Sequence, residues 1–123
     1  MTRYTRGRDF EHRISRRLEQ AGYAVIRAAS SKGAADLVAI GHGHTLLVQC
    51  KLAGSSLPPA EWNALYRLAR QGDGLVPIAA FGRGAGRPPA FYELLDFKAD
   101  GRSGQPWEEA DWIGTDGWEV ARA

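Results

Sequence analysis

Three polar residues in two apolar segments carry the chemistry that this sequence can support. Asp36 begins the run Asp-Leu-Val-Ala-Ile, and Gln49 and Lys51 lie at the end of the run 45–51. Apolar strands rarely hold an acid and a lysine without a function. Gln49 and Lys51 are two residues apart, so a strand directs both to one face. A tight connection at 41–44 would fold the second strand back beside the first and bring Asp36 near its end.

An acid, an amide oxygen and a lysine at one sheet edge suit metal-dependent hydrolysis of a phosphodiester. That reaction needs charge neutralisation at the phosphate and an activated water, which one or two divalent metals supply. Hard cations such as Mg²⁺ prefer oxygen ligands, available from Asp36, the Gln49 side chain and the backbone carbonyl at Cys50. Lys51 can orient the water or stabilise developing charge. Glu11 completes the site if its helix packs across the sheet edge.

The segment before the acidic residue offers groups that bind phosphate. It provides two hydroxyls, backbone N–H groups and a cation; these belong to Ser30, Ser31, Lys32 and Gly33. Arg27, which ends the preceding predicted strand, can contact phosphate in the same way. Residues 1–51 hold nine Lys or Arg against four Asp or Glu, which favours a polyanionic partner. A solvated charged face explains the charge balance alone equally well.

The length and composition limit the class of protein. The 123 residues suffice for one domain with a core but not for two. No apolar run approaches the roughly 20 residues that span a bilayer, and no signal peptide is evident. Cys50 is the sole cysteine, which excludes a disulfide framework and a thiolate zinc site. We therefore expect a cytoplasmic protein without a membrane partner.

Hydrophobic periodicity predicts an α/β fold. The helices are expected over 8–21 and 60–71, and the strands over 23–28, 36–40, 45–51, 75–81 and 91–97. The order α-β-β-β-α-β-β predicts a mixed central β-sheet flanked by helices. His42 and His44 are interpreted as exposed turn residues, and Trp62 as a core or dimer residue. Arg83 and Arg87 suit DNA contact and solvation equally.

The last part of the chain differs in composition from the rest. Residues 99–123 are acidic and glycine-rich, with tryptophans at 107, 112 and 118. Three tryptophans argue against disorder. We therefore predict a nuclease domain over 1–98 and an acidic extension over 99–123 that packs on the domain or on a dimer partner.

Four short segments occur in a recognisable order. They are Arg6-Gly7-Arg8-Asp9-Phe10-Glu11, Arg27-Ala28-Ala29-Ser30-Ser31-Lys32-Gly33, Asp36-Leu37-Val38-Ala39-Ile40 and Val48-Gln49-Cys50-Lys51. Together they resemble the archaeal-type Holliday junction resolvases, including bacteriophage-borne versions, of the PD-(D/E)xK nuclease superfamily. The resemblance covers 6–51 well and 58–97 loosely, and does not reach 99–123. It implies a restriction-endonuclease-like fold. It also implies a homodimer that nicks four-way DNA junctions symmetrically, in DNA recombination and repair. The reaction it implies requires Mg²⁺ or Mn²⁺ and no small-molecule cofactor.

The resemblance also implies roles for individual residues. Glu11, Asp36 and Gln49 would be metal-site residues, and Lys51 the catalytic lysine. Ser31 corresponds to a loop serine near the scissile phosphate. Arg6 and Arg8 correspond to a basic N-terminal segment with which members of the family contact the junction backbone.

Two positions depart from the superfamily pattern. Ala35 replaces a proline that is not a ligand. Gln49 replaces the usual glutamate, which keeps an oxygen but removes a charge, so metal affinity should fall. Two alternatives to a junction resolvase therefore stay open. One is another nuclease of the superfamily that cuts flaps, mismatches or duplex, and the other is an inactive junction-binding protein.

Overall fold

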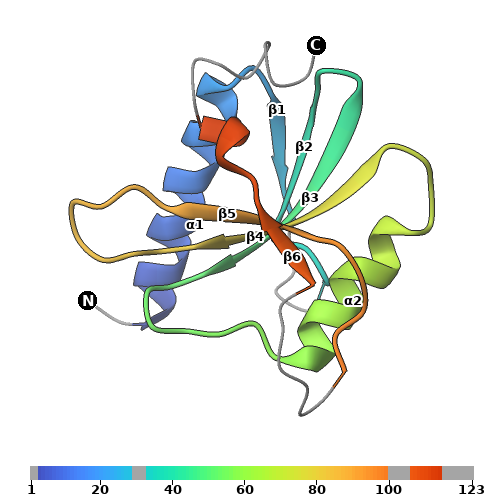
Figure 1. The fold of residues 1–123 in the computed structure, drawn as a ribbon. Coiled ribbons are helices and arrows are strands. Elements are labelled where there is room, and N and C mark those ends of the chain that lie inside the picture. The colour runs from blue at the N-terminus through green and yellow to red at the C-terminus, as the bar shows by residue number, and fades with distance from the viewer. Residues whose placement is uncertain (1–2, 29–32, 100–105, 115–123) are drawn as a thin grey trace.

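A single mixed sheet organises the fold. The computed structural model describes residues 3–28, 33–99 and 106–114. In this part of the chain, six strands form one sheet in the order β1-β2-β3-β4-β5-β6, with α1 and α2 on opposite faces (Figure 1). The predicted fold class, a mixed sheet flanked by helices, is confirmed. In the same residues, no helix is long and apolar enough to cross a membrane.

The elements follow the predicted order with shifted ends and one added strand. The helices are α1 (Arg3–Gln20), α2 (Pro59–Ala69) and the short 3-10 helix η1 (Asp111–Gly114); the strands are β1 (Ala24–Arg27), β2 (Leu37–Gly41), β3 (His44–Lys51), β4 (Leu75–Phe81), β5 (Ala90–Leu94) and β6 (Trp107–Glu109). Neighbouring strands are antiparallel except β3 and β4, which are parallel. The parallel pair requires a crossover, and α2 forms it.

Helix α1 covers one face of the sheet with a stripe of apolar side chains. Phe10, Ile14 and Leu18 are buried against residues of β2, β3 and β4. The predicted start at residue 8 is wrong, since the helix begins at Arg3. The N-terminal turns are too polar to show in the hydrophobic periodicity on which the prediction depended. The end is close to the expected one, and Gly22 follows with a φ of +95°.

Helix α2 covers the other face and is held there by buried side chains and a side-chain hydrogen bond. Pro59 lies in its first turn, as the sequence predicts. Trp62 and Leu65 are fully buried, with 0% of each residue exposed, which confirms Trp62 as a core residue. The Trp62 indole Nε1–H also donates to the carbonyl of Asp96 at 2.9 Å. The position of α2 relative to the sheet is therefore set by packing and by a directed bond.

The connection between β2 and β3 is the expected tight hairpin. Gly41 pairs with His44, and the two residues between them have positive φ, 56° for His42 and 80° for Gly43. This is the geometry of a two-residue turn that suits the strand twist. His42 is exposed as predicted, but the same prediction for His44 is wrong. His44 is buried at 8% exposure, and one of its ring nitrogens lies 2.8 Å from the Tyr23 hydroxyl.

The sheet has a sixth strand that the sequence did not predict. β6 pairs antiparallel with β5, and in Figure 1 it crosses in front of the sheet and is followed by η1, which lies beside α1. Ala110 and Ile113 are buried in the cluster beneath α1. A three-residue strand with two glutamates carries almost no periodic signal, which explains the omission. The division of the chain at residue 98 stays a prediction.

Trp107 is the side chain through which β6 contacts the α2 face. Its ring stacks on Tyr92, with 4.3 Å between centroids, and also lies against Trp62 and Phe81. We expect Trp107→Ala to lower the free energy of unfolding by about 2 kcal/mol, since a half-buried aromatic is removed. Urea denaturation measures this. An unchanged midpoint would show that β6 contributes nothing to stability.

Candidate active site

Asp36 is held rigidly at the start of β2. Its N–H donates to the carbonyl of Val48 at 2.8 Å, and its own carbonyl accepts from the Ala28 N–H at 2.9 Å. Its side-chain Oδ2 accepts a third bond, 2.9 Å, from the Cys50 N–H. The carboxylate therefore joins the start of β2 to the end of β3. The same bond is what a purely structural strand-end cap would make, so geometry at Asp36 alone does not assign a function.

Gln49 and Lys51 lie on the α2 face of β3, as their spacing predicts. Leu47, two residues earlier, packs under α2, and Cys50 packs on the α1 side. The Gln49 Oε1 atom is buried and has no hydrogen-bond partner among the described residues. The Lys51 ammonium donates to Glu61 of α2 at 2.6 Å. One face of β3 therefore carries two polar groups, two residues apart. Gln49 offers a buried oxygen without a hydrogen bond in the described residues, and Lys51 offers an ammonium held by Glu61.

Glu11 approaches the same end of the sheet from α1. Its carboxylate accepts a bond of 3.4 Å from the Arg27 guanidinium, at the end of β1. Its charge is also close enough to interact with Asp36. The prediction that α1 brings Glu11 toward the sheet edge therefore agrees with the fold. Its role as a ligand stays a prediction.

The electrostatics of the site disfavour negative charge in the absence of a cation. Burial raises the pKa of Asp36 above its usual value, although the Cys50 N–H and the Lys51 charge lower it. Burial and the charge of Asp36 raise the pKa of Glu11, against the opposing effect of Arg27. Burial, then Asp36 and Glu11, raise the pKa of the Cys50 thiol well above its usual value. A bound cation would reverse this cost.

The donor set fits a hard divalent cation. Asp36 offers a carboxylate, and the buried Gln49 Oε1 atom is otherwise left with an unmet desolvation cost. Within residues 3–28, 33–99 and 106–114, no cluster of three or more His, Cys, Asp or Glu side chains is placed to hold a metal. The site therefore depends on the amide oxygen. The Cys50 carbonyl stays a predicted ligand.

The raised pKa of Asp36 predicts how stability depends on pH. A carboxyl group with a higher pKa in the folded protein favours folding at low pH, and this contribution is lost as pH rises toward the folded-state pKa. Asp36→Asn cannot ionise but keeps an oxygen for the Cys50 N–H. In EDTA, we expect the melting temperature of the wild type minus that of Asp36→Asn to fall as pH rises above about 4, the ordinary pKa of an aspartate. A difference that rises with pH would contradict this.

The structure describes some of the predicted DNA-binding residues and not others. Ser30, Ser31 and Lys32 lie outside the described residues. Arg6 and Arg8 are exposed. Both lie on α1, because the helix begins at Arg3 and not at residue 8 as the sequence predicts. Residues two apart on a helix face different directions, whereas residues three apart share a face. Arg8 therefore lies on the side of Glu11, and Arg6 does not.

Sequence reasoning missed Glu61. It lies in the first turn of α2, where glutamate is common because it interacts favourably with the helix dipole. Its ion pair with Lys51 spans ten residues and depends on how α2 packs, so no local pattern reveals it.

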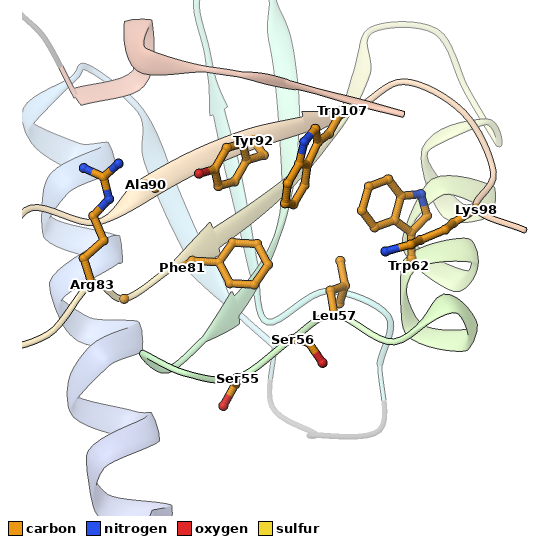
Figure 2. A pocket seen from close by; sticks show the side chains of 11 residues that line it. Ser55, Ser56, Leu57, Trp62, Phe81, Arg83, Ala90, Tyr92, Lys98 and Trp107 are labelled. Atoms are coloured by element: carbon orange, nitrogen blue, oxygen red, sulfur yellow. The ribbon is translucent and has the colours of Figure 1, made fainter. Parts of the chain in front are cut away.

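A pocket of about 400 Å³ lies on the same face, one strand away from Lys51. Phe81, its central wall, is the register partner of Lys51 across β3 and β4. Figure 2 shows the rings of Phe81, Tyr92 and Trp107 on one side of the pocket and Trp62 with Lys98 on the other. None of the residues that line it is an acid, so this pocket is not part of the metal site. Arg83, at its edge, is exposed.

Comparison with known proteins supports the same interpretation. Residues 2–59 match the family model described as archaeal Holliday junction resolvase (Hjc). A stretch of 54 residues is 43% identical to the crossover junction endodeoxyribonuclease Hjc of Methanocaldococcus jannaschii, and it covers 44% of this chain and 40% of that protein. The structure of Archaeoglobus fulgidus Hjc, a Holliday junction resolvase, superposes with a TM-score of 0.65 at 24% identity over 94% of this chain and 95% of that one. The structural likeness shows the fold.

Proposed function

We propose that this chain, whose residues 2–59 match the model of the archaeal Holliday junction resolvase (Hjc) family, belongs to that family and is a metal-dependent endonuclease that resolves four-way DNA junctions. One observation carries the proposal. The matched segment contains Asp36, Gln49 and Lys51, and these converge at one end of the sheet, where the buried Gln49 Oε1 atom has no hydrogen-bond partner among the described residues. That is a site for a cation and a phosphate rather than a satisfied core.

The side chains of the site would have different roles in phosphodiester hydrolysis. Asp36, Gln49 and the Cys50 carbonyl would hold Mg²⁺, with Mn²⁺ as a substitute, and Glu11 would bind it directly or through water. A cation held there would supply charge neutralisation at the phosphate and a water of lowered pKa. Lys51 orients that water or stabilises charge as it develops on the phosphate.

Symmetric resolution requires two sites, so we propose a homodimer. A closed two-fold dimer places two copies of the site in fixed relation, which allows paired nicks in opposing strands. Sedimentation equilibrium measures the mass directly. A monomer that nicks only one strand per binding event would favour another nuclease of the superfamily, one that cuts flaps, mismatches or duplex.

DNA contact is proposed along the basic side of α1 and the loop before Asp36. Arg8, on the face of Glu11, would contact the backbone together with Arg27, and Ser30, Ser31 and Lys32 would contact the phosphate near the cut. Arg6 extends the basic surface on the other side of the helix.

The two arginines of α1 form a matched pair for testing this contact. We expect Arg8→Ala to weaken junction binding and to lower the slope of log affinity against log salt by about 0.9, which is one phosphate contact. Arg6→Ala, with the same charge change, should have a smaller effect because it faces away from Glu11. Fluorescence anisotropy over a range of salt concentrations measures both slopes. Equal effects would show general rather than directed attraction.

Substrate selectivity tests the proposed function. A labelled four-way junction and a linear duplex with the sequence of two of its arms are incubated together with the protein and Mg²⁺. We expect the junction to be cut and the duplex to stay intact. Cutting of both would identify a different nuclease, and tight junction binding without cutting would identify an inactive binding protein. The neutral Gln49 is the feature that favours this last possibility.

Two further attributes are proposed on the same basis. A nuclease of this kind acts where DNA recombines and is repaired, so we propose a cytoplasmic location and, if the gene is phage-borne, the host cytoplasm. We also propose that residues 1–98 form the nuclease domain and that 99–123 are an extension. Cleavage by a protein that ends at residue 98 tests this division, provided that circular dichroism shows it stays folded without β6 and the buried Ile113.

A further inference from the structure

The proposed metal site lacks negative charge. Gln49 offers an oxygen but no charge, and the Glu11 carboxylate lies 3.4 Å from the Arg27 guanidinium, which offsets it. Within the described residues, Asp36 is then the one carboxylate at the centre of the site that forms no ion pair. Mg²⁺ in proteins is usually bound by one or two carboxylates together with substrate phosphates, so without DNA a second carboxylate at this site would strengthen cation binding.

Glu61 provides a carboxylate near the proposed metal site from helix α2. Its Oε1 atom lies 2.6 Å from the Lys51 ammonium, and Lys51 is two residues from Gln49 on the same face of β3. Its negative charge also acts on Asp36 and contributes to the raised pKa of that carboxyl. Glu61 therefore lies among the three residues that define the site.

An ordinary surface role does not account for this placement. A glutamate in the first turn of a helix gains from the helix dipole while pointing to solvent, and an ion pair between exposed side chains contributes little to stability. Here the partner is the half-buried Lys51, with 18% of its side chain exposed. Trp62, the next residue, is fully buried and hydrogen-bonded, so the backbone of Glu61 is fixed relative to β3.

We propose that Glu61 supplies the metal-site carboxylate that position 49 lacks, binding the cation together with Asp36 and the Gln49 oxygen while it positions the Lys51 ammonium. This inference rests on the proposed metal-dependent function. The Glu61 side chain is 45% exposed, so it has the rotational freedom to turn an oxygen from Lys51 toward Asp36. A carboxylate from α2 would thus restore the charge that β3 does not provide.

Reciprocal substitution tests the proposal through metal binding without DNA. Mn²⁺ affinity is measured by electron paramagnetic resonance for the wild type, Glu61→Gln, Gln49→Glu and the double variant. We expect Glu61→Gln to weaken Mn²⁺ binding by about tenfold or more. Gln49→Glu should strengthen binding, and the double variant should return close to the wild-type affinity because the carboxylate has moved from α2 to β3. Glu19→Gln, an exposed change of equal charge on α1, should leave the affinity unchanged.

The outcomes separate this inference from the proposed function. Wild-type Mn²⁺ affinity in folded Glu61→Gln, or a double variant that binds as weakly as Glu61→Gln, would overturn the role of Glu61 even if the wild type cuts junctions. No Mn²⁺ binding by the wild type would overturn it as well. The expected pattern of Mn²⁺ affinities would support Glu61 even if no junction is cut, in which case the proposed substrate alone is wrong. Circular dichroism confirms that each variant is folded.

Discussion

Asp36→Asn is expected to reduce the rate of junction cleavage at least about 10³-fold, while the protein stays folded and binds the junction. The substitution keeps an oxygen for the Cys50 N–H, so the connection between β2 and β3 survives. What it removes is the charge at the centre of the proposed metal site. Mn²⁺ affinity should fall together with cleavage. Single-turnover cleavage and anisotropy with the same labelled junction measure activity and binding separately.

Asp73→Asn is the matched control for this substitution. Asp73 is exposed just before β4, which begins beside Thr45 at the opposite end of β3 from Lys51, so the same chemical change should leave cleavage unaltered. If Asp36→Asn lost binding along with cleavage, the residue would be structural, as the bond to Cys50 alone permits. If it cut at the wild-type rate, the proposed site would be wrong.

Lys51→Ala is expected to reduce cleavage by roughly 10² to 10³-fold, since a cation aimed at the reacting phosphate is removed. Unlike Asp36→Asn, it should leave Mn²⁺ affinity unchanged or higher, because no ligand is lost and Glu61 is released from its 2.6 Å ion pair. Metal titration and single-turnover cleavage of the same preparation distinguish the two substitutions. A parallel loss of metal affinity would mean that Lys51 acts by holding the site together and not on the phosphate.

The sequence predicts most of the fold because the relevant patterns are local. The apolar stripe of α1 and the glycines at the β2–β3 connection each define their element without long-range information. The convergence of Asp36 with β3 also follows, since antiparallel pairing through a two-residue turn fixes the register. The placement of Asp36 next to Cys50 is a consequence of that register.

What the sequence could not predict depends on packing between distant segments. His44 looks like a turn residue until Tyr23 and Trp112 lie against it. The strand β6 is too short to show periodicity and forms because β5 offers it an edge. Glu61 reads as a helix-start residue until α2 docks on the sheet and directs it to Lys51.

Cleavage of an end-labelled four-way junction, with each strand labelled in turn, in Mg²⁺, Mn²⁺ and EDTA tests the central claim most directly. We predict paired nicks at symmetric positions in two opposing strands, in either metal, and none in EDTA. Folded protein that binds the junction but leaves all four strands intact in both metals would contradict the claim. It would show that the site around Asp36, Gln49 and Lys51 does not hydrolyse DNA.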